Sequence, residues 1–142
     1  MLQKILNLIL GGKNVLLVGT SDSGKTFFGK NELTPFFRKQ GIKVAYFKNM
    51  NKKIIYKKDE ILVLDEFEIL EDQTFLEKLH PEEKPYYSEK YLQDVHKWLK
   101  KAESIKNPCI YILTRNGIQE IEYIKKIKSF SFKENVKIIE FK

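Results

Sequence analysis

The sequence predicts an α/β fold in which helices cover both faces of a five-stranded parallel sheet. Apolar runs of strand length alternate along the chain with segments of helical period, a pattern that is typical of parallel strands joined by helices. The chain has 142 residues and contains no internal repeat, low-complexity tract or Ser/Gly-rich linker. We therefore expect a single domain over residues 1–142.

Each predicted element follows from a short pattern. A short apolar helix from about Leu2 to Leu10 comes first, and a second helix from about Ser88 to Glu103 lies in the longest connection. Within the second helix, Trp98 shares one face with other apolar residues, so we expect it to be part of the core. That face carries Tyr91, Val95, Trp98, Leu99 and Ala102. The predicted strands are Asn14–Gly19, Lys43–Phe47, Glu60–Glu66, Cys109–Thr114 and Val136–Phe141.

Pro35 lies in the middle of the helical segment that follows the first strand. A proline inside a helix removes one backbone hydrogen bond and clashes with the preceding turn, so the chain must kink or restart there. Thr34 as N-cap, Pro35 at the first helical position and Gly41 just past the end favour a restart.

Composition limits the classes of protein that need be considered. Hydrophobic residues make up 42% of the chain and aromatic residues 13%, which is typical of a folded globular protein. The N-terminal run "ILNLILGG" is too short to span a bilayer and has no small-residue cleavage site, so we expect a cytoplasmic protein with no membrane partner. Cys109 is the only cysteine, which excludes an internal disulfide, and His80 and His96 lack zinc-ligand spacing.

The net charge of +7 comes almost entirely from lysine, because Arg38 and Arg115 are the only arginines. Lysines are concentrated in "KNMNKKIIYKK" (Lys48–Lys58) and in "KKIK" (Lys125–Lys128). Such clusters are typical of a solubilising face, and they are also compatible with contacts to the phosphate backbone of DNA.

The stretch "GTSDSGKT" has the spacing of a phosphate-binding loop and stands between an apolar strand and a helix. Backbone N–H groups of such a loop bind a triphosphate as fixed dipoles at a helix N-terminus. Gly19 permits the turn out of the strand and Gly24 lets the backbone approach the phosphates. We expect Lys25 to contact the β and γ oxygens of ATP, and the Thr26 hydroxyl to bind Mg²⁺. The eight residues of the predicted nucleotide site are Gly19, Thr20, Ser21, Asp22, Ser23, Gly24, Lys25 and Thr26.

Asp22 brings a negative charge to this loop, where many such loops have glycine. Its position is on the outer bend, where a side chain can point to solvent, and aspartate tolerates left-handed backbone. We therefore expect Asp22 to permit binding and to weaken the affinity for nucleotide that lacks magnesium.

Two further motifs stand at the carboxyl ends of predicted strands. In "ILVLDE", Asp65 stands at the carboxyl end of a buried strand, where a parallel sheet binds its ligands, and Glu66 follows it. Asp65 can hold the water shell of Mg²⁺, and Glu66 can take the proton of an attacking water. In "YILTRN", Thr114, Arg115 or Asn116 would orient that water or sense the nucleotide, although a simple turn explains this stretch as well.

With these motifs in this order, the chain resembles the AAA+ ATPases, and among them the bacterial replication-initiator and helicase-loader branch. The resemblance covers nearly the whole chain, with "NVLLVGTSDSGKT" as Walker A, "DEILVLDE" as Walker B and "CIYILTRN" as the sensor 1 strand. It implies a three-layer P-loop NTPase fold with strand order 5-1-4-3-2. It also implies Lys25 and Thr26 as phosphate and magnesium residues, Asp65 as magnesium partner, Glu66 as catalytic base and Asn116 as sensor.

Two departures from the family bear on activity. The segment "KSFSF" has Phe130 and Ser131 where the family has an arginine finger, and the sequence stops after its fifth strand, without the helical lid. An arginine finger contributes on the order of a thousandfold to turnover. We therefore expect secure ATP binding and slow hydrolysis, unless Arg115, a larger protein partner or a second copy of the chain completes the site.

The sequence thus predicts an ATP-binding, slowly hydrolysing switch or accessory factor in DNA replication or in a mobile element. One alternative is a small P-loop kinase that phosphorylates a nucleoside, a nucleotide or a polynucleotide end, and the aspartate-containing loop resembles that of some polynucleotide kinases. Another is a degenerate binding module with a merely structural nucleotide. A regulatory GTPase is disfavoured because the chain has no Asn-Lys-x-Asp motif.

Overall fold

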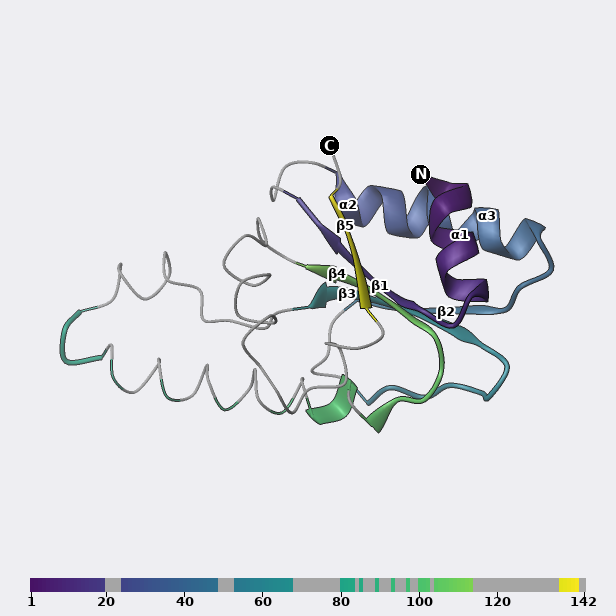
Figure 1. Ribbon diagram of the computed structural model, residues 1–142. Helices are drawn as coiled ribbons and strands as arrows, with labels where there is room; N and C mark the ends of the chain where they lie inside the picture. Colours follow the sequence, from purple (N-terminus) through teal and green to yellow (C-terminus); the bar gives the residue numbers. More distant parts are fainter. Residues whose placement is uncertain are drawn as a thin grey trace.

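The computed structural model describes residues 1–19, 24–48, 53–67, 80–83, 85, 89, 93, 97, 100–102, 104–113 and 136–140. The five strands form one sheet in the order β2-β3-β4-β1-β5, and every neighbouring pair is parallel (Figure 1). This confirms the predicted α/β fold and the strand order 5-1-4-3-2, which is the same order read from the other edge. The elements are α1 (Leu2–Leu10), β1 (Asn14–Val18), α2 (Lys25–Phe27), η1 (Phe28–Leu33), α3 (Thr34–Lys39), β2 (Val44–Phe47), β3 (Ile61–Phe67), β4 (Cys109–Leu113) and β5 (Val136–Glu140).

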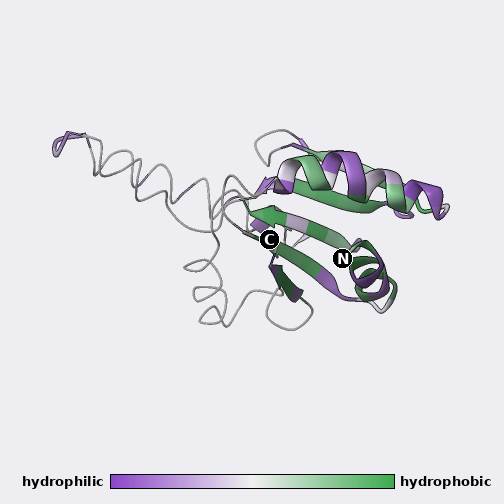
Figure 2. Cartoon of the chain, turned by 90° about the horizontal axis from the view of Figure 1, so that it is seen from above, coloured by the Kyte–Doolittle hydropathy of each residue, from purple (hydrophilic) through white to green (hydrophobic). Residues whose placement is uncertain are grey.

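The central strands are apolar because both faces of the sheet are covered. Every residue of β4 is buried, as are Val15–Val18 of β1, whereas Lys137 and Ile138 of the edge strand β5 are exposed. Figure 2 shows the strands as mostly hydrophobic and the helix after β1 as a mixture of hydrophobic and hydrophilic turns. A continuous apolar strand is what a sheet covered on both sides requires.

Two apolar clusters fill the space on either side of the sheet. The first packs α1, η1 and α3 against one face, and Figure 1 shows these helices together on that side. The second covers the other face and includes Ala102 from the connection between β3 and β4, with Ile54 and Tyr56 packed against it. Successive strand residues alternate between the clusters, so that Ile61 and Val63 belong to the first and Leu62 and Leu64 to the second.

The N-terminal apolar run forms α1, as predicted. Ile5, Leu6 and Ile9 of this nine-residue helix are buried, while Leu10 is exposed. Its apolar face therefore contributes to the first cluster. Within the part of the chain that the structure describes, no helix is long and apolar enough to cross a membrane.

The prediction of a helix restart at Pro35 is wrong. Thr34 has helical dihedral angles (φ −60°, ψ −48°), so it is not an N-cap, and the helix passes through Pro35 from α2 to α3. The six residues before α3 form the π-helical segment η1, and the Thr34 hydroxyl donates a hydrogen bond to the Gly29 carbonyl at 2.8 Å. The wider turn accommodates a proline that an α-helix would not, because it changes which carbonyl groups face the ring.

The end of this helix agrees with the prediction. Gly41 has φ +79°, and its N–H donates to the Arg38 carbonyl while the Ile42 N–H donates to the Phe37 carbonyl. This is the Schellman arrangement, in which glycine adopts the left-handed conformation just past the helix.

Gly29 allows the helix after β1 to lie very close to the sheet. A Cβ atom at this position would stand 2.5 Å from Cδ1 of Ile112, a fully buried side chain of β4. Any larger residue would push the helix or Ile112 away. The helix that begins at Lys25 therefore packs closely on β4 at this position.

The second predicted helix is described only in part. Residues 85, 89, 93, 97, 100–102 and 104 are helical, and among them Ala102 is buried, as predicted. The predictions for Tyr91, Val95, Trp98 and Leu99 lie outside the described residues.

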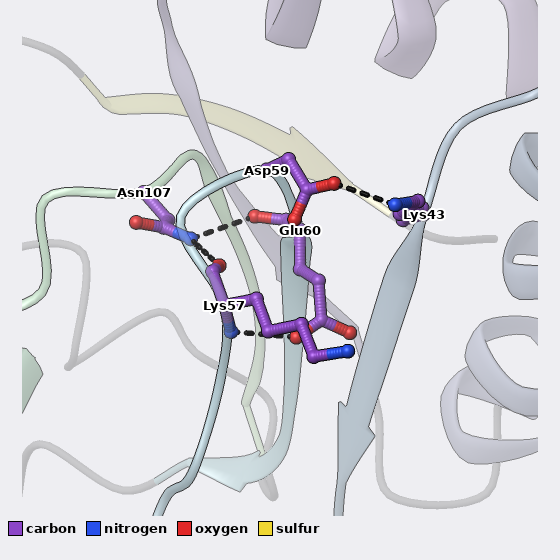
Figure 3. Close-up of polar contacts among 5 residues, drawn as sticks. All are labelled: Lys43, Lys57, Asp59, Glu60 and Asn107. Carbon is purple, nitrogen blue, oxygen red and sulfur yellow. Dashed lines mark hydrogen bonds and ion pairs between the residues drawn. The ribbon is translucent and has the colours of Figure 1, made fainter.

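Asparagine side chains join the strands at the amino edge of the sheet. Nδ2 of Asn107 donates to the carbonyl groups of Lys57 at 2.8 Å and of Glu60 at 2.9 Å, which ties the segments before β3 and β4 together (Figure 3). Asn14 of β1 accepts a hydrogen bond from the N–H of Cys109 at 3.0 Å. The nearby ion pair of Lys43 with Asp59 is exposed, so it contributes little to stability.

We predict that Asn107→Ala lowers the free energy of unfolding by about 1 to 3 kcal/mol, because two carbonyl groups lose their donor. Urea unfolding followed by circular dichroism measures this. Asn7→Ala is the matched control, since its exposed side chain accepts a hydrogen bond from the exposed Gln3, and it should change stability by less than about 0.5 kcal/mol. Equal effects of the two substitutions would contradict the conclusion that Asn107 holds the segments before β3 and β4 together.

Candidate functional site

The predicted phosphate-binding loop begins where β1 ends and closes where α2 begins. Gly19 directly follows β1 and is buried, and Gly24 is the N-cap of α2 with φ +87°. Only glycine adopts this left-handed conformation without strain, so the requirement for glycine at position 24 has a backbone reason. The predicted site residues Thr20, Ser21, Asp22 and Ser23 lie outside the described residues.

The side chain of Lys25 turns back toward Gly19 at the end of β1. Its side chain is only 4% exposed, and Nζ donates a hydrogen bond to the Gly19 carbonyl at 2.5 Å. Desolvation lowers the pKa of Lys25 below its ordinary value, and the negative charge of Asp65 partly opposes that change. The ammonium group is therefore held at the carboxyl end of β1, in the field of an acid from another strand.

Asp65 is the counterpart of Lys25 on β3 and is 1% exposed. Its Oδ1 accepts a hydrogen bond from the backbone N–H of Glu66 at 2.8 Å, and its Oδ2 accepts one from the hydroxyl of Tyr46. Strand β4 lies between β3 and β1, so both charged residues stand at the same edge of the sheet. The structure thus brings together the two motifs that the sequence places forty residues apart along the chain (Lys25 and Asp65).

The backbone at Glu66 departs from a regular strand. Glu66 has φ +53°, the only positive φ of a residue other than glycine in the described chain. Between the pairs Leu64–Tyr111 and Phe67–Leu113, β3 advances three residues while β4 advances two, so β3 contains a bulge. Bulges and strained backbone are concentrated at functional sites, where they redirect a side chain. Glu66 is exposed beside the buried Asp65.

Tyr46 is a site residue that sequence reasoning missed. It lies near the end of β2, the neighbour of β3, and burial raises its pKa above the ordinary value, as do its hydrogen bond to Asp65 and the charges of Asp65 and Glu66. The hydroxyl is therefore a neutral donor. The available signal was a polar aromatic residue near the end of the strand "KVAYF", combined with the strand order that places this strand beside "ILVLDE".

The residues present fit a magnesium-bound phosphate group. Thr26 is exposed directly after Lys25, and its hydroxyl and the Asp65 carboxylate are the hard oxygen donors that Mg²⁺ prefers. No group of three or more His, Cys, Asp or Glu residues that could hold a metal occurs among the residues described here. A metal ion at this edge would therefore depend on oxygen atoms from phosphate and water as well.

Other predicted site residues remain predictions. Thr114, Arg115 and the predicted sensor Asn116 follow β4 and lie outside the described residues, as does the segment "KSFSF" with Phe130 and Ser131.

Fold and site together define an α/β protein with a five-stranded all-parallel sheet, whose order is compatible with the topology of P-loop NTPases. The chain matches no protein-family model, no curated protein and no solved structure at a significant level.

We predict that Asp65→Asn lowers the pKa of Lys25 further, because a neutral amide no longer offsets the desolvation of the ammonium group. An NMR titration of the lysine ε-carbon signals, with Lys25→Ala for assignment, measures this. In the control Asp59→Asn, the pKa of Lys43 should fall, since Asp59 raises it, and that of Lys25 should not change. A Lys25 pKa that is unaffected by Asp65→Asn would refute the proximity of the two charges.

Proposed function

We propose that this protein is an ATP-binding, AAA+-like P-loop ATPase of low intrinsic turnover that acts as a nucleotide-dependent switch or accessory factor. The observation that carries the proposal is the joint burial of Lys25 and Asp65, 4% and 1% exposed, at the carboxyl edge of β1 and β3. Ligands of open α/β sheets bind at this edge.

Burial of these charges is difficult to explain by stability alone. Removing a lysine and an aspartate from water carries a large desolvation penalty, which their attraction offsets only in part. Desolvation lowers the pKa of Lys25 even though Asp65 lies nearby. Charged groups kept in such a state are concentrated at binding and catalytic sites. A phosphate group bound beside Lys25 would add negative charge next to the ammonium group and favour its protonated form.

The proposed roles combine the positions of the described residues with the motifs of the sequence. The backbone N–H groups of residues 19–26 and the ammonium group of Lys25 bind the phosphates, while Thr26 and Asp65 hold the metal side of the site. Mg²⁺ would supply neutralisation of charge on the phosphate oxygens. Glu66 is exposed, so water can reach its carboxylate, which takes a proton from the attacking water. Asn116 orients that water.

Slow turnover is proposed because the chain has few cations suited to the transition state. Of its two arginines, Arg38 donates a hydrogen bond to the Val44 carbonyl at 3.3 Å, at the amino end of β2. That is the edge of the sheet opposite to Asp65. Arg115 is the remaining arginine of the chain, so Arg115, a protein partner or a second copy of the chain is the proposed source of a further cation.

As part of its role as an accessory factor, the protein is proposed to contact DNA through exposed lysines. Lys57 and Lys58 are exposed just before β3, at the amino edge of the sheet. DNA bound there would not compete with nucleotide at the carboxyl edge. Affinity for DNA should fall steeply with salt if the contact is to the backbone.

We predict that Lys25→Ala weakens ATP binding by about 10- to 100-fold, because charge-assisted contacts to phosphate are lost. Isothermal titration calorimetry with Mg-ATP measures the affinity. Lys30→Ala is the matched control, since Lys30 is exposed on η1 of the same helix, and it should bind as the wild type does. The proposal is refuted if the wild type gives no heat of binding, or if Lys25→Ala binds Mg-ATP as tightly as the wild type does.

We also predict that Glu66→Gln keeps ATP affinity within about twofold and lowers phosphate release by about 10²- to 10⁴-fold, the usual contribution of a general base. Release of labelled phosphate from γ-labelled ATP measures turnover. Unchanged hydrolysis would remove Glu66 from the mechanism. Label that moves to a nucleoside or to a polynucleotide end would indicate the kinase alternative.

A further inference from the structure

Tyr46 contacts the metal side of the proposed site from a strand that no motif marks. It pairs with Val63 in the parallel register of β2 and β3. Asp65 follows Val63 by two residues, which brings it to the same face of the sheet. The phenol side chain thus reaches diagonally across to the carboxylate, and its hydroxyl donates to Oδ2 of Asp65.

Both carboxylate oxygens of Asp65 have a donor. The backbone N–H of Glu66 donates to Oδ1, and this amide belongs to the bulge of β3. Together with Tyr46 it gives each carboxylate oxygen a hydrogen bond, while Lys25 supplies the opposing charge. A carboxylate that is 1% exposed depends on such donors, because little water reaches it.

We infer that Tyr46 is a positioning residue for the metal-binding carboxylate: its hydroxyl holds Asp65 in the orientation in which the carboxylate meets magnesium bound to the nucleotide. The inference rests on the proposed function and deepens it, because it assigns to β2 a part in metal binding. In this role Tyr46 would act on Asp65 and not on the metal or the phosphate itself. Its effect therefore passes through Asp65 and must be largest when magnesium is present.

A purely structural role for Tyr46 has different consequences. The ring is partly buried and packs against the first apolar cluster, and phenylalanine preserves that packing. If the hydroxyl served stability alone, its loss would lower the melting temperature and affect nucleotide with and without metal equally. If the hydroxyl orients Asp65, its loss weakens the affinity for Mg-ATP and leaves the affinity for metal-free ATP nearly unchanged.

The test compares Tyr46→Phe with wild type by calorimetry, using ATP with excess Mg²⁺ and ATP with EDTA. We expect affinity for Mg-ATP to fall about tenfold, the effect of one hydrogen bond to a charged group, and affinity for metal-free ATP to stay within about twofold. Tyr56→Phe is the matched control, because Tyr56 packs on the opposite face of the sheet. It should leave both affinities unchanged.

A double-mutant cycle identifies the path of the effect. On an Asp65→Asn background, Tyr46→Phe should change the affinity for Mg-ATP by less than about twofold, because the carboxylate on which it acts is gone. Equal weakening with and without metal, no weakening at all, or a full effect on the Asp65→Asn background would overturn the inference. If the wild-type protein binds no ATP, the proposed function is wrong as well. If it binds ATP and Lys25→Ala removes that binding, the proposed function stands and only the role of Tyr46 is wrong.

Discussion

The structure depends on a pair of opposite charges held out of water at one edge of a parallel sheet. Lys25 and Asp65 come from segments that follow β1 and end β3, with β4 between these strands. Neither charge is stable there alone, since an isolated buried ion loses far more hydration than a folded protein can offset. The Gly19 carbonyl, the Tyr46 hydroxyl and the Glu66 amide supply the hydrogen bonds that make the arrangement possible.

The amino and carboxyl edges of the sheet differ in structure. At the amino edge, side chains of Asn14 and Asn107 bind backbone groups of neighbouring segments, which holds β1, β3 and β4 in register. At the carboxyl edge, the backbone departs from regular geometry at Gly24 and Glu66 and exposes Thr26. A rigid frame at one end permits strained, charged groups at the other, because the surrounding packing and hydrogen bonds hold them in place.

Much of the fold could be predicted from the sequence because its physical signals are local. Apolar runs marked the five strands, although Lys137 and Glu140 interrupt the run of β5. Gly41 marked the end of its helix, where the backbone is left-handed. The strand order needed the resemblance to a family, since periodicity does not say which strands are neighbours. Tyr46 was missed although the predicted order places β2 beside β3, because the order does not give the register through which Tyr46 meets Asp65, 19 residues away in the sequence. Pro35 was misjudged because rules for α-helices do not foresee a π-helical turn.

The most direct test of the central claim replaces Mg²⁺ by paramagnetic Mn²⁺ and records backbone amide signals by NMR with ATP present. If both motifs meet around one metal-bound phosphate group, the amide signals of Gly24, Lys25 and Thr26 should broaden together with those of Asp65 and Glu66. The amide signal of Asn107, at the opposite edge of the sheet, should stay sharp. Broadening that affects only one of the two motifs, or neither, would contradict the account.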